Sequence, residues 1–291
     1  MKIYEALNYA KGKLSNIIKN KGRAYSEAEA LMLFTLKVTR EELYMHFHDV
    51  LGKKKFAEYK KTINLRLKHI PMQYITRESY FYSRDFFIQR GVFIPRPETE
   101  TVIEAVKYLK SKLCKNASAA DIGTGSGIIA VTLLCEIPEI ETMHAFDISV
   151  KAINTAKPNA KKYNCFGRIK FIKNDFFGFI NKHKTKYDIV LSNPPYISLK
   201  DMKKLEDEVL IEPHSALTDK KDGLSFYTKF MKYAKIFLKN EGYLVFEIGD
   251  NTAQRIKEIF SNEAWSFIKI LNDFNDKERV MIYRYDGEEN D

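Results

Sequence analysis

The expected fold follows from Asp121-Ile122-Gly123-Thr124-Gly125-Ser126-Gly127. This stretch comes after a short run of small residues, 117–120, which we interpret as a strand. It precedes an apolar run, 128–134, which we interpret as a helix. Glycine at alternate positions lets the backbone turn sharply and approach a ligand, and a helix start presents free N–H groups. Dinucleotide-binding folds use the same device, so this loop alone predicts an α/β fold but no particular ligand.

Two further strands are expected to end in polar residues. The run 143–146 ends at Asp147, and an acid at the tip of a second strand can accept hydrogen bonds from both hydroxyls of a ribose. The run 169–172 precedes Asp175 and Phe176, a carboxylate and a ring that can hold the edge and the face of an adenine. Ligands of open parallel sheets bind at the carboxyl ends of the strands. We therefore expect these residues on the same rim as the glycine loop.

A fourth strand end carries Asn193-Pro194-Pro195-Tyr196, directly after the apolar run 189–191. Proline lacks an N–H and has a fixed φ, so two prolines end the strand in a rigid loop. The Asn193 carboxamide oxygen and the Pro194 carbonyl can together accept both hydrogens of a planar NH2 group, and the Tyr196 ring can stack on it. Asn-Pro is also a common turn dipeptide, so an ordinary strand-ending turn is the alternative for this motif alone.

The length of 291 residues is sufficient for two domains, and the net charge of +10 is unevenly distributed. Residues 1–90 carry 18 Lys/Arg against 9 Asp/Glu, whereas residues 91–291 carry 30 against 29. A basic first third fits an acidic or nucleic-acid partner, or only a solvated surface. No run is long enough to span a bilayer, and the N-terminus has no signal-peptide pattern. Three scattered cysteines suit a reducing cytoplasm, and no metal site is expected.

The first third of the chain has a helical pattern, with expected segments near 4–14, 26–36, 40–43 and 54–68. Two short strands, 80–82 and 85–88, are expected to form a hairpin. The stretch 95–100 then leads into a helix, with Thr99 as a capping residue. We expect a helical recognition domain over 1–80, a β-hairpin linker over 81–97 and a catalytic domain over 98–291.

The order of these motifs resembles that of the class I S-adenosylmethionine-dependent methyltransferases, among which Asn-Pro-Pro-Tyr is the signature of enzymes that methylate a planar amide or amino nitrogen. The resemblance narrows to the release factor glutamine methyltransferases and covers essentially the whole chain. It is carried by segments that occur in the same order: 71–75, 81–83, 94–100, 123–127, 192–196, 212–217 and 278–280. Phe176 stands where many relatives have tryptophan, and Ser83 where glycine is frequent.

The resemblance implies a Rossmann-like, mainly parallel seven-stranded sheet with a small N-terminal helical domain. The implied methyl donor is S-adenosyl-L-methionine, which leaves S-adenosyl-L-homocysteine. The implied cofactor-binding residues are Gly123, Thr124, Gly125, Ser126, Gly127, Asp147, Asp175, Phe176 and Asn193. The implied substrate-binding residues are Asn193, Pro194, Pro195 and Tyr196, of which Asn193, Pro194 and Tyr196 are expected to be catalytic.

The substrate implied by the resemblance is the glutamine of the Gly-Gly-Gln loop of class 1 peptide chain release factors, methylated on its side-chain nitrogen N5 in support of translation termination. A narrow slot admits this glutamine because its glycine neighbours lack Cβ. The alternatives are an N6-adenine-type nucleic-acid methyltransferase, a glutamine methyltransferase of another protein, and a binding module without activity. We expect a cytoplasmic monomer that acts on release factors and requires neither a membrane nor nucleic acid.

Overall fold

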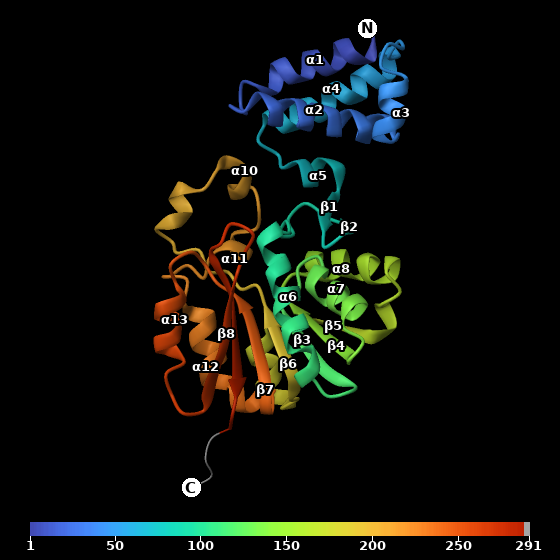
Figure 1. Ribbon diagram of the computed structural model, residues 1–291. Coiled ribbons are helices and arrows are strands. Elements are labelled where there is room, and N and C mark those ends of the chain that lie inside the picture. The colour runs from blue at the N-terminus through green and yellow to red at the C-terminus, as the bar shows by residue number, and fades with distance from the viewer. Residues whose placement is uncertain (288–291) are drawn as a thin grey trace. The chain divides into compact units, whose positions relative to one another are not determined.

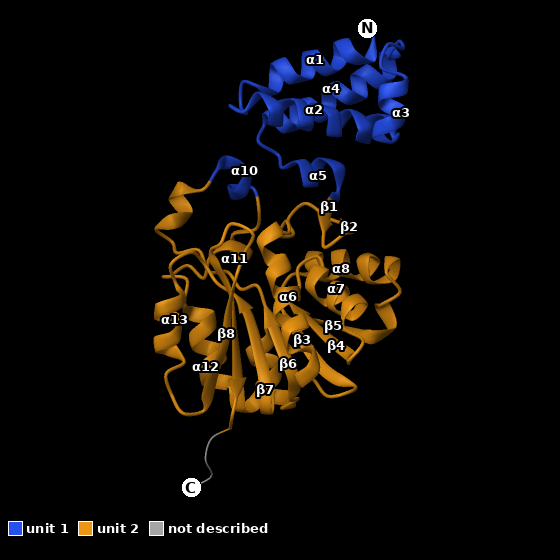
Figure 2. Ribbon diagram, in the orientation of Figure 1, with its two compact units in different colours: residues 1–78, 206–211 blue, residues 79–205, 212–291 orange. Residues whose placement is uncertain are grey.

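The computed structural model describes residues 1–287 (Figure 1). The chain divides into two compact units, which Figure 2 colours separately. The first unit contains residues 1–78 and 206–211, and the second contains residues 79–205 and the chain from 212 onward. The chain therefore passes between the units after residues 78, 205 and 211, because the short segment 206–211 leaves the second unit and returns to it.

The first unit is helical, and the helices α1 to α5 contribute buried apolar residues to it. They are α1 (Ile3–Leu14), α2 (Lys21–Leu36), α3 (Arg40–Met45), α4 (Lys53–Leu67), α5 (Met72–Thr76) and α10 (Asp207–Leu210). In α1 the buried residues recur three and four positions apart, which places them on one side of the helix. Helix α2 begins earlier than the sequence predicted, near Lys21 instead of Ser26. Asn20 explains this start, because its side chain caps the helix by accepting a hydrogen bond from the Arg23 N–H at 3.0 Å.

An ion-pair cluster ties α10 to the other helices of the first unit. The guanidinium of Arg66 is almost fully buried and lies 2.6 Å from Glu27 Oε2 and 2.6 Å from Glu208 Oε2. Arg23 bonds the same two carboxylates from the more exposed side, at 3.0 Å each. Sequence analysis did not predict this contact, because Arg66 and Glu208 are 142 residues apart in the chain.

The second unit contains, within its described residues, a seven-stranded sheet of order β5-β4-β3-β6-β7-β9-β8. The strands are β3 (Ala117–Ile122), β4 (Ile140–Asp147), β5 (Ile169–Lys173), β6 (Tyr187–Ser192), β7 (Leu238–Glu247), β8 (Trp265–Asn272) and β9 (Glu278–Tyr285). Pairing is parallel from β5 to β7 and antiparallel on both sides of β9. The expected mainly parallel sheet of seven strands with an N-terminal helical region is confirmed.

Helices cover both faces of this sheet (Figure 1). They are α6 (Glu100–Leu109), α7 (Ile128–Glu136), α8 (Val150–Lys162), α9 (Phe176–His183), α11 (His214–Leu217), α12 (Ser225–Phe237) and α13 (Ala253–Ile259). Neighbouring residues of the central strands belong to different cores: Ala119 packs into one and Ala120 into the other. Successive side chains of a strand point to opposite faces, so both faces of a central strand such as β3 are buried and most of its residues are apolar, with Asp121 as a buried exception.

The parallel register brings the strand ends with the predicted motifs together. Ile122, the last residue of β3, pairs with Phe146 of β4 on one side and with Ser192 of β6 on the other. The chain leaves β3 toward β4 and β5 in one direction, whereas β6 and β7 lie in the other. The strand order therefore reverses between β3 and β6, and such a reversal is where open α/β sheets bind ligands.

A two-stranded hairpin, β1 (Glu78–Phe81) and β2 (Arg84–Phe87), precedes the sheet. Its two turn residues, Tyr82 and Ser83, have φ values of 48° and 58°. Positive φ at both central positions is the type I′ geometry that matches the twist of a hairpin. Glycine tolerates this conformation best, which explains why glycine is frequent at the position that Ser83 occupies here.

Candidate active site

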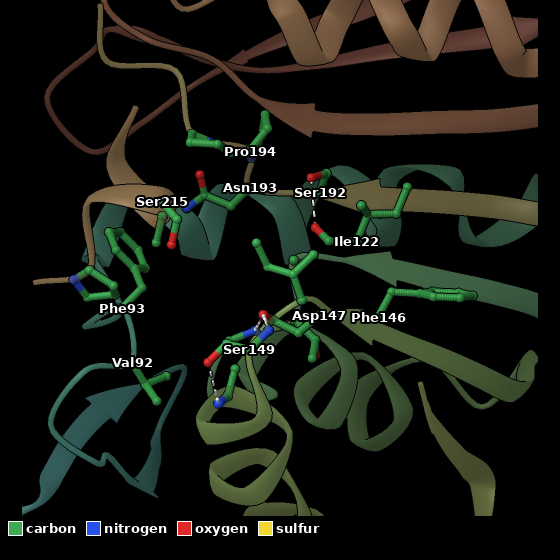
Figure 3. A pocket seen from close by; sticks show the side chains of 18 of the residues that line it. Val92, Phe93, Ile122, Phe146, Asp147, Ser149, Ser192, Asn193, Pro194 and Ser215 are labelled. Carbon is green, nitrogen blue, oxygen red and sulfur yellow. Dashed lines mark hydrogen bonds between the residues drawn. The ribbon is translucent and has the colours of Figure 1, made fainter. Parts of the chain in front are cut away.

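A cavity lies at the carboxyl ends of β3, β4, β5 and β6 (Figure 3). Its walls include most of the residues that the sequence singled out: Gly123, Thr124, Gly125, Ser126, Asp147, Asp175, Phe176, Asn193, Pro194 and Pro195. Gly127 and Tyr196 are not among the lining residues. The structure thus brings four separate strand ends to one cavity, with Asp147 and Asn193 on different sides of the open space in Figure 3.

The glycine loop needs glycine at specific positions. Gly123, Gly125 and Gly127 have φ values of 76°, 56° and 80°, a conformation that residues with a Cβ rarely adopt. A Cβ at Gly127 would also lie 2.8 Å from Ala156 Cβ of α8. The N–H groups of Gly123 and Thr124 both donate to the Phe146 carbonyl at 2.9 Å. These bonds hold the loop over the end of β4. Helix α7 starts directly after the loop.

Asp147 supports the glycine loop as well as facing the cavity. Its Oδ2 accepts a hydrogen bond from the Gly125 N–H at 3.0 Å, and its Oδ1 accepts one from the Ser149 N–H at 2.8 Å. Burial raises the pKa of this carboxyl above its ordinary value. Each carboxylate oxygen has two lone pairs, so both can still accept a ligand hydroxyl. The sequence indicated that Asp147 can accept hydrogen bonds from a ligand, but it did not indicate that Asp147 supports the glycine loop.

Asp175 and Phe176 are engaged by the protein itself. Asp175 caps α9 through Oδ2, which accepts the Gly178 N–H at 2.7 Å. The Phe176 ring is 3% exposed and packs edge-to-face on Phe146 and Phe237, with ring centroids 5.0 and 5.3 Å apart. Only a small part of Phe176 therefore faces the cavity. Ile148, which is 59% exposed at the cavity, supplies apolar surface that the sequence analysis overlooked.

Asp121 is a buried acid directly before the glycine loop. It is fully buried, and neither of its oxygens has a hydrogen-bond partner among the described residues. Burial raises its pKa to about 7. The Thr124 hydroxyl, which lines the cavity, is also buried and without a partner. Asp121 is not among the lining residues, whereas Thr124 is. Because unpaired buried polar groups are costly, the Thr124 hydroxyl suits a ligand that brings a hydrogen-bonding group.

The Asn193 carboxamide has a defined orientation. Its Nδ2 donates to the Thr99 hydroxyl at 3.0 Å, and no described residue donates a hydrogen bond to its Oδ1. Thr99 is 1% exposed and makes no capping hydrogen bond to α6, so the expectation that it caps this helix is wrong. Its hydroxyl is instead used to hold Asn193. The oxygen of the carboxamide is thereby left available to accept a substrate N–H.

Tyr196 is held by three contacts. Its hydroxyl donates to Glu247 Oε1, at the end of β7, at 2.9 Å. Its ring packs so closely on Gly249 that a Cβ there would lie 3.1 Å from the ring. Gly223, with φ of 85°, approaches the Tyr196 carbonyl so closely that a Cβ there would lie at 2.1 Å. The Asn-Pro-Pro-Tyr segment is therefore fixed by glycines on neighbouring loops.

Two further segments line the cavity, and sequence analysis gave neither a role. Phe93 and Pro95 come from the segment before α6, and Pro213, Ser215 and Ala216 come from the start of α11. An ion pair between Arg96 and Glu212 joins the two segments, and Glu212 Oε2 also accepts the Ile94 N–H at 2.9 Å. The sequence analysis used the segments 94–100 and 212–217 as evidence for the family resemblance. It did not predict from this that they lie at the cavity.

Residues 1–287 contain no helix that is both long and apolar enough to cross a membrane. Over the same residues there is no group of three or more His, Cys, Asp and Glu side chains arranged to hold a metal ion.

Comparison with known proteins identifies the family. The PrmC N-terminal domain family matches residues 5–76, and the methyltransferase small domain family matches residues 98–241. The release factor glutamine methyltransferase of Bacillus subtilis is 34% identical over 284 residues, which cover 96% of each chain. This chain belongs to the release factor glutamine methyltransferase family. A family protein from Staphylococcus aureus, also 34% identical, covers 93% of this chain and 96% of its own length.

Two further proteins are similar to this chain, one in sequence and one in fold. The bifunctional methyltransferase of Rickettsia typhi is 36% identical over 297 residues, and the chain spans 56% of that longer protein. The hMettl16 catalytic domain, solved with an RNA hairpin, has a TM-score of 0.51 at 15% identity and covers 82% of this chain and 84% of its own. This second similarity shows the class I methyltransferase fold alone.

Proposed function

We propose that this methyltransferase transfers a methyl group from S-adenosyl-L-methionine to the side-chain nitrogen N5 of the glutamine in the Gly-Gly-Gln motif of class 1 peptide chain release factors. The observation that carries the proposal is the Asn193 carboxamide, held by Thr99 with Oδ1 free, beside the glycine loop. Membership in a family whose curated members bear this activity in their names supports the same substrate.

The cofactor fits the groups that line the cavity. S-adenosyl-L-methionine supplies a methyl group on a sulfonium and carries a ribose, an adenine and an amino acid end. Asp147 would accept hydrogen bonds from the ribose, and Asp175 and Phe176 would meet the adenine. Residues 123–127 would lie against the remainder of the cofactor, because a loop with glycine at alternate positions lets a ligand approach the backbone closely. The unpartnered Thr124 hydroxyl, which lines the cavity, suits a polar group of the cofactor.

An amide nitrogen is a weak nucleophile because its lone pair is delocalised into the carbonyl. Asn193 Oδ1 and the Pro194 carbonyl would accept its two N–H groups, which holds the nitrogen and stabilises the positive charge it gains as it attacks. Holding two reactants in line supplies a proximity contribution that reaches about 7–11 kcal/mol in well-oriented systems. Pro195 would complete the substrate contacts from the cavity wall, and Tyr196, held by Glu247, would fix the end of the Asn-Pro-Pro-Tyr segment.

Residues 1–80 are proposed to recognise the release factor, with 81–97 as a linker and 98–291 as the catalytic domain. The excess of 18 basic over 9 acidic side chains in residues 1–90 favours an acidic partner surface. Each described residue that lines the cavity belongs to the second unit, which supports a role of the second unit, without the helical one, in cofactor binding. We propose that the enzyme acts as a monomer in the cytoplasm, without a nucleic-acid requirement.

Asn193 provides the test of this mechanism. Asn193→Ala should lower kcat on a release factor by about 100-fold or more, as removal of one transition-state contact does, with cofactor affinity little changed. Asn193→Asp keeps acceptor oxygens and should retain part of the activity. Asn181→Ala, an exposed site on α9, is the matched control and should behave as wild type. Wild-type kcat in Asn193→Ala would remove this residue from the mechanism.

A further inference from the structure

A series of buried polar groups continues behind Asn193. Thr99, which receives the Asn193 Nδ2 hydrogen bond, is 1% exposed, and so is Glu247. Glu247 Oε1 accepts the Tyr196 hydroxyl at 2.9 Å, whereas Oε2 is buried and has no hydrogen-bond partner among the described residues. The Thr99 hydroxyl lies beside this carboxyl and lowers its pKa. The end of β7 thus contacts both Asn193, through Thr99, and Tyr196.

The direction of these hydrogen bonds matters for Asn193. The two ends of a carboxamide have nearly the same shape, so its partners alone decide whether oxygen or nitrogen faces the cavity. A hydroxyl has one hydrogen to donate. Because Thr99 accepts from Asn193, its own hydrogen must point elsewhere, and the unpartnered Glu247 Oε2 beside it is an acceptor.

We propose that Glu247, as a carboxylate, is the positioning residue that sets this direction. Its Oε1 accepts from Tyr196, and its unpartnered Oε2 would accept from the neighbouring Thr99 hydroxyl. Thr99 then accepts from Asn193, and Asn193 Oδ1 faces the substrate nitrogen. This inference rests on the proposed function, in which that oxygen accepts an amide N–H.

Protonation of Glu247 would reverse the direction. A carboxylic acid donates through its O–H to Thr99, whose hydrogen then points to Asn193. The carboxamide would turn and present its NH2 group to the substrate NH2 group, and two donors cannot bond each other. Burial raises the pKa of Glu247 to about 7. The charged and titratable groups that face it are Glu98, which raises the pKa, and Tyr196 and Arg279, which lower it. The Tyr227 hydroxyl donates to its backbone carbonyl at 2.9 Å.

Glu247→Gln separates charge from shape. Glutamine has the same size. The Tyr196 hydroxyl, which donates to Oε1, would hold the glutamine oxygen, so the NH2 group would take the place of Oε2, donate to Thr99 and impose the reversed direction. We expect kcat to fall about 100-fold, the effect of losing one transition-state contact, with cofactor affinity and unfolding temperature within error of wild type. Glu241→Gln, on the same strand with an 80% exposed side chain, is the matched control. Wild-type kcat in Glu247→Gln would overturn the inference.

Thr99 gives a second and independent series. Thr99→Val has the same shape and cannot relay a hydrogen bond, so it should be as slow as Glu247→Gln, whereas Thr99→Ser should keep most of the activity. Wild-type kcat should fall about tenfold for each pH unit below about 7 and should be level above it, because the carboxylate is the active form. Thr99→Val should lack this dependence. A wild-type profile in Thr99→Val would refute the relay.

A readout without substrate distinguishes this inference from the proposed function. The side-chain NH2 signals of Asn193, recorded by NMR after 15N-asparagine labelling and assigned by their loss in Asn193→Ala, should shift with a midpoint near pH 7. They should be insensitive to pH in Glu247→Gln. Signals that do not titrate in the wild type would overturn the relay. If they titrate as expected but release factor is never methylated, the relay stands and the proposed substrate is wrong.

Discussion

Gly127→Ala tests the close packing of Gly127, at the start of α7, against Ala156 of α8. Gly127 has φ of 80°, which costs an alanine about 1–2 kcal/mol. The new Cβ would lie 2.8 Å from Ala156 Cβ and 3.2 Å from Ala156 Cα, and overpacking of this kind costs about 1–3 kcal/mol. We therefore expect the free energy of unfolding to fall by about 2–5 kcal/mol, measured by urea denaturation followed by circular dichroism.

Two other glycines separate the contributions. Gly125→Ala meets no atom nearer than 3.9 Å but has φ of 56°, so it should lose only the backbone part, about 1–2 kcal/mol. Gly167→Ala has open space and no left-handed backbone, and should stay within about 0.5 kcal/mol of wild type. Ala156→Gly removes the Cβ that the new alanine at position 127 would meet. In the double variant, the stability lost to overpacking should therefore be partly recovered, measured as a favourable coupling energy between the two substitutions. A Gly127→Ala variant no less stable than Gly125→Ala would refute the reasoning.

Three further changes test other parts of the molecule. Asp147→Ala should weaken cofactor binding by about 1.5–3 kcal/mol, roughly 10- to 150-fold by calorimetry, and an unchanged affinity would exclude Asp147 from the cofactor site. The pKa of Asp121 is raised from 3.8 to about 7, so its contribution to stability is present below pH 4 and lost as pH rises through 7, by about 4 kcal/mol. Asp121→Asn should therefore gain stability relative to wild type between pH 4 and pH 8 in urea titrations, and a constant difference would contradict the assignment. Arg66→Ala leaves Glu27 and Glu208 without their buried partner and should cost about 3–5 kcal/mol in the same assay, whereas a loss below about 1 kcal/mol would show that the cluster is not stabilising.

The sequence predicted the rim of the sheet well because its signals are local. A glycine loop between a strand and a helix, an acid at the end of β4 and prolines after β6 each mark a strand end. Parallel strands bring their carboxyl ends to one edge, so three local signals became one site. The order of the motifs also predicted the family, and with it the mainly parallel sheet.

The missed features depend on partners far apart in the chain. Thr99 has the sequence features of a helix cap, but its hydroxyl bonds Asn193, which is 94 residues away. The segment 206–211 belongs to the helical unit through the Arg66–Glu208 pair, and neither residue has a local signal for it. The sequence around Phe176 is compatible both with a ring packed in the core and with a ring that stacks on a ligand, and it does not distinguish the two. Such features require the packed structure.

The most direct test of the central claim is methyl transfer from isotope-labelled S-adenosyl-L-methionine to a purified class 1 release factor, with the product located by mass spectrometry. The account predicts a single methyl group on the side-chain nitrogen of the Gly-Gly-Gln glutamine. It also predicts no transfer to a release factor in which that glutamine is replaced by alanine. Label in DNA or RNA, or in another protein, with the release factor unmodified under the same conditions, would contradict it.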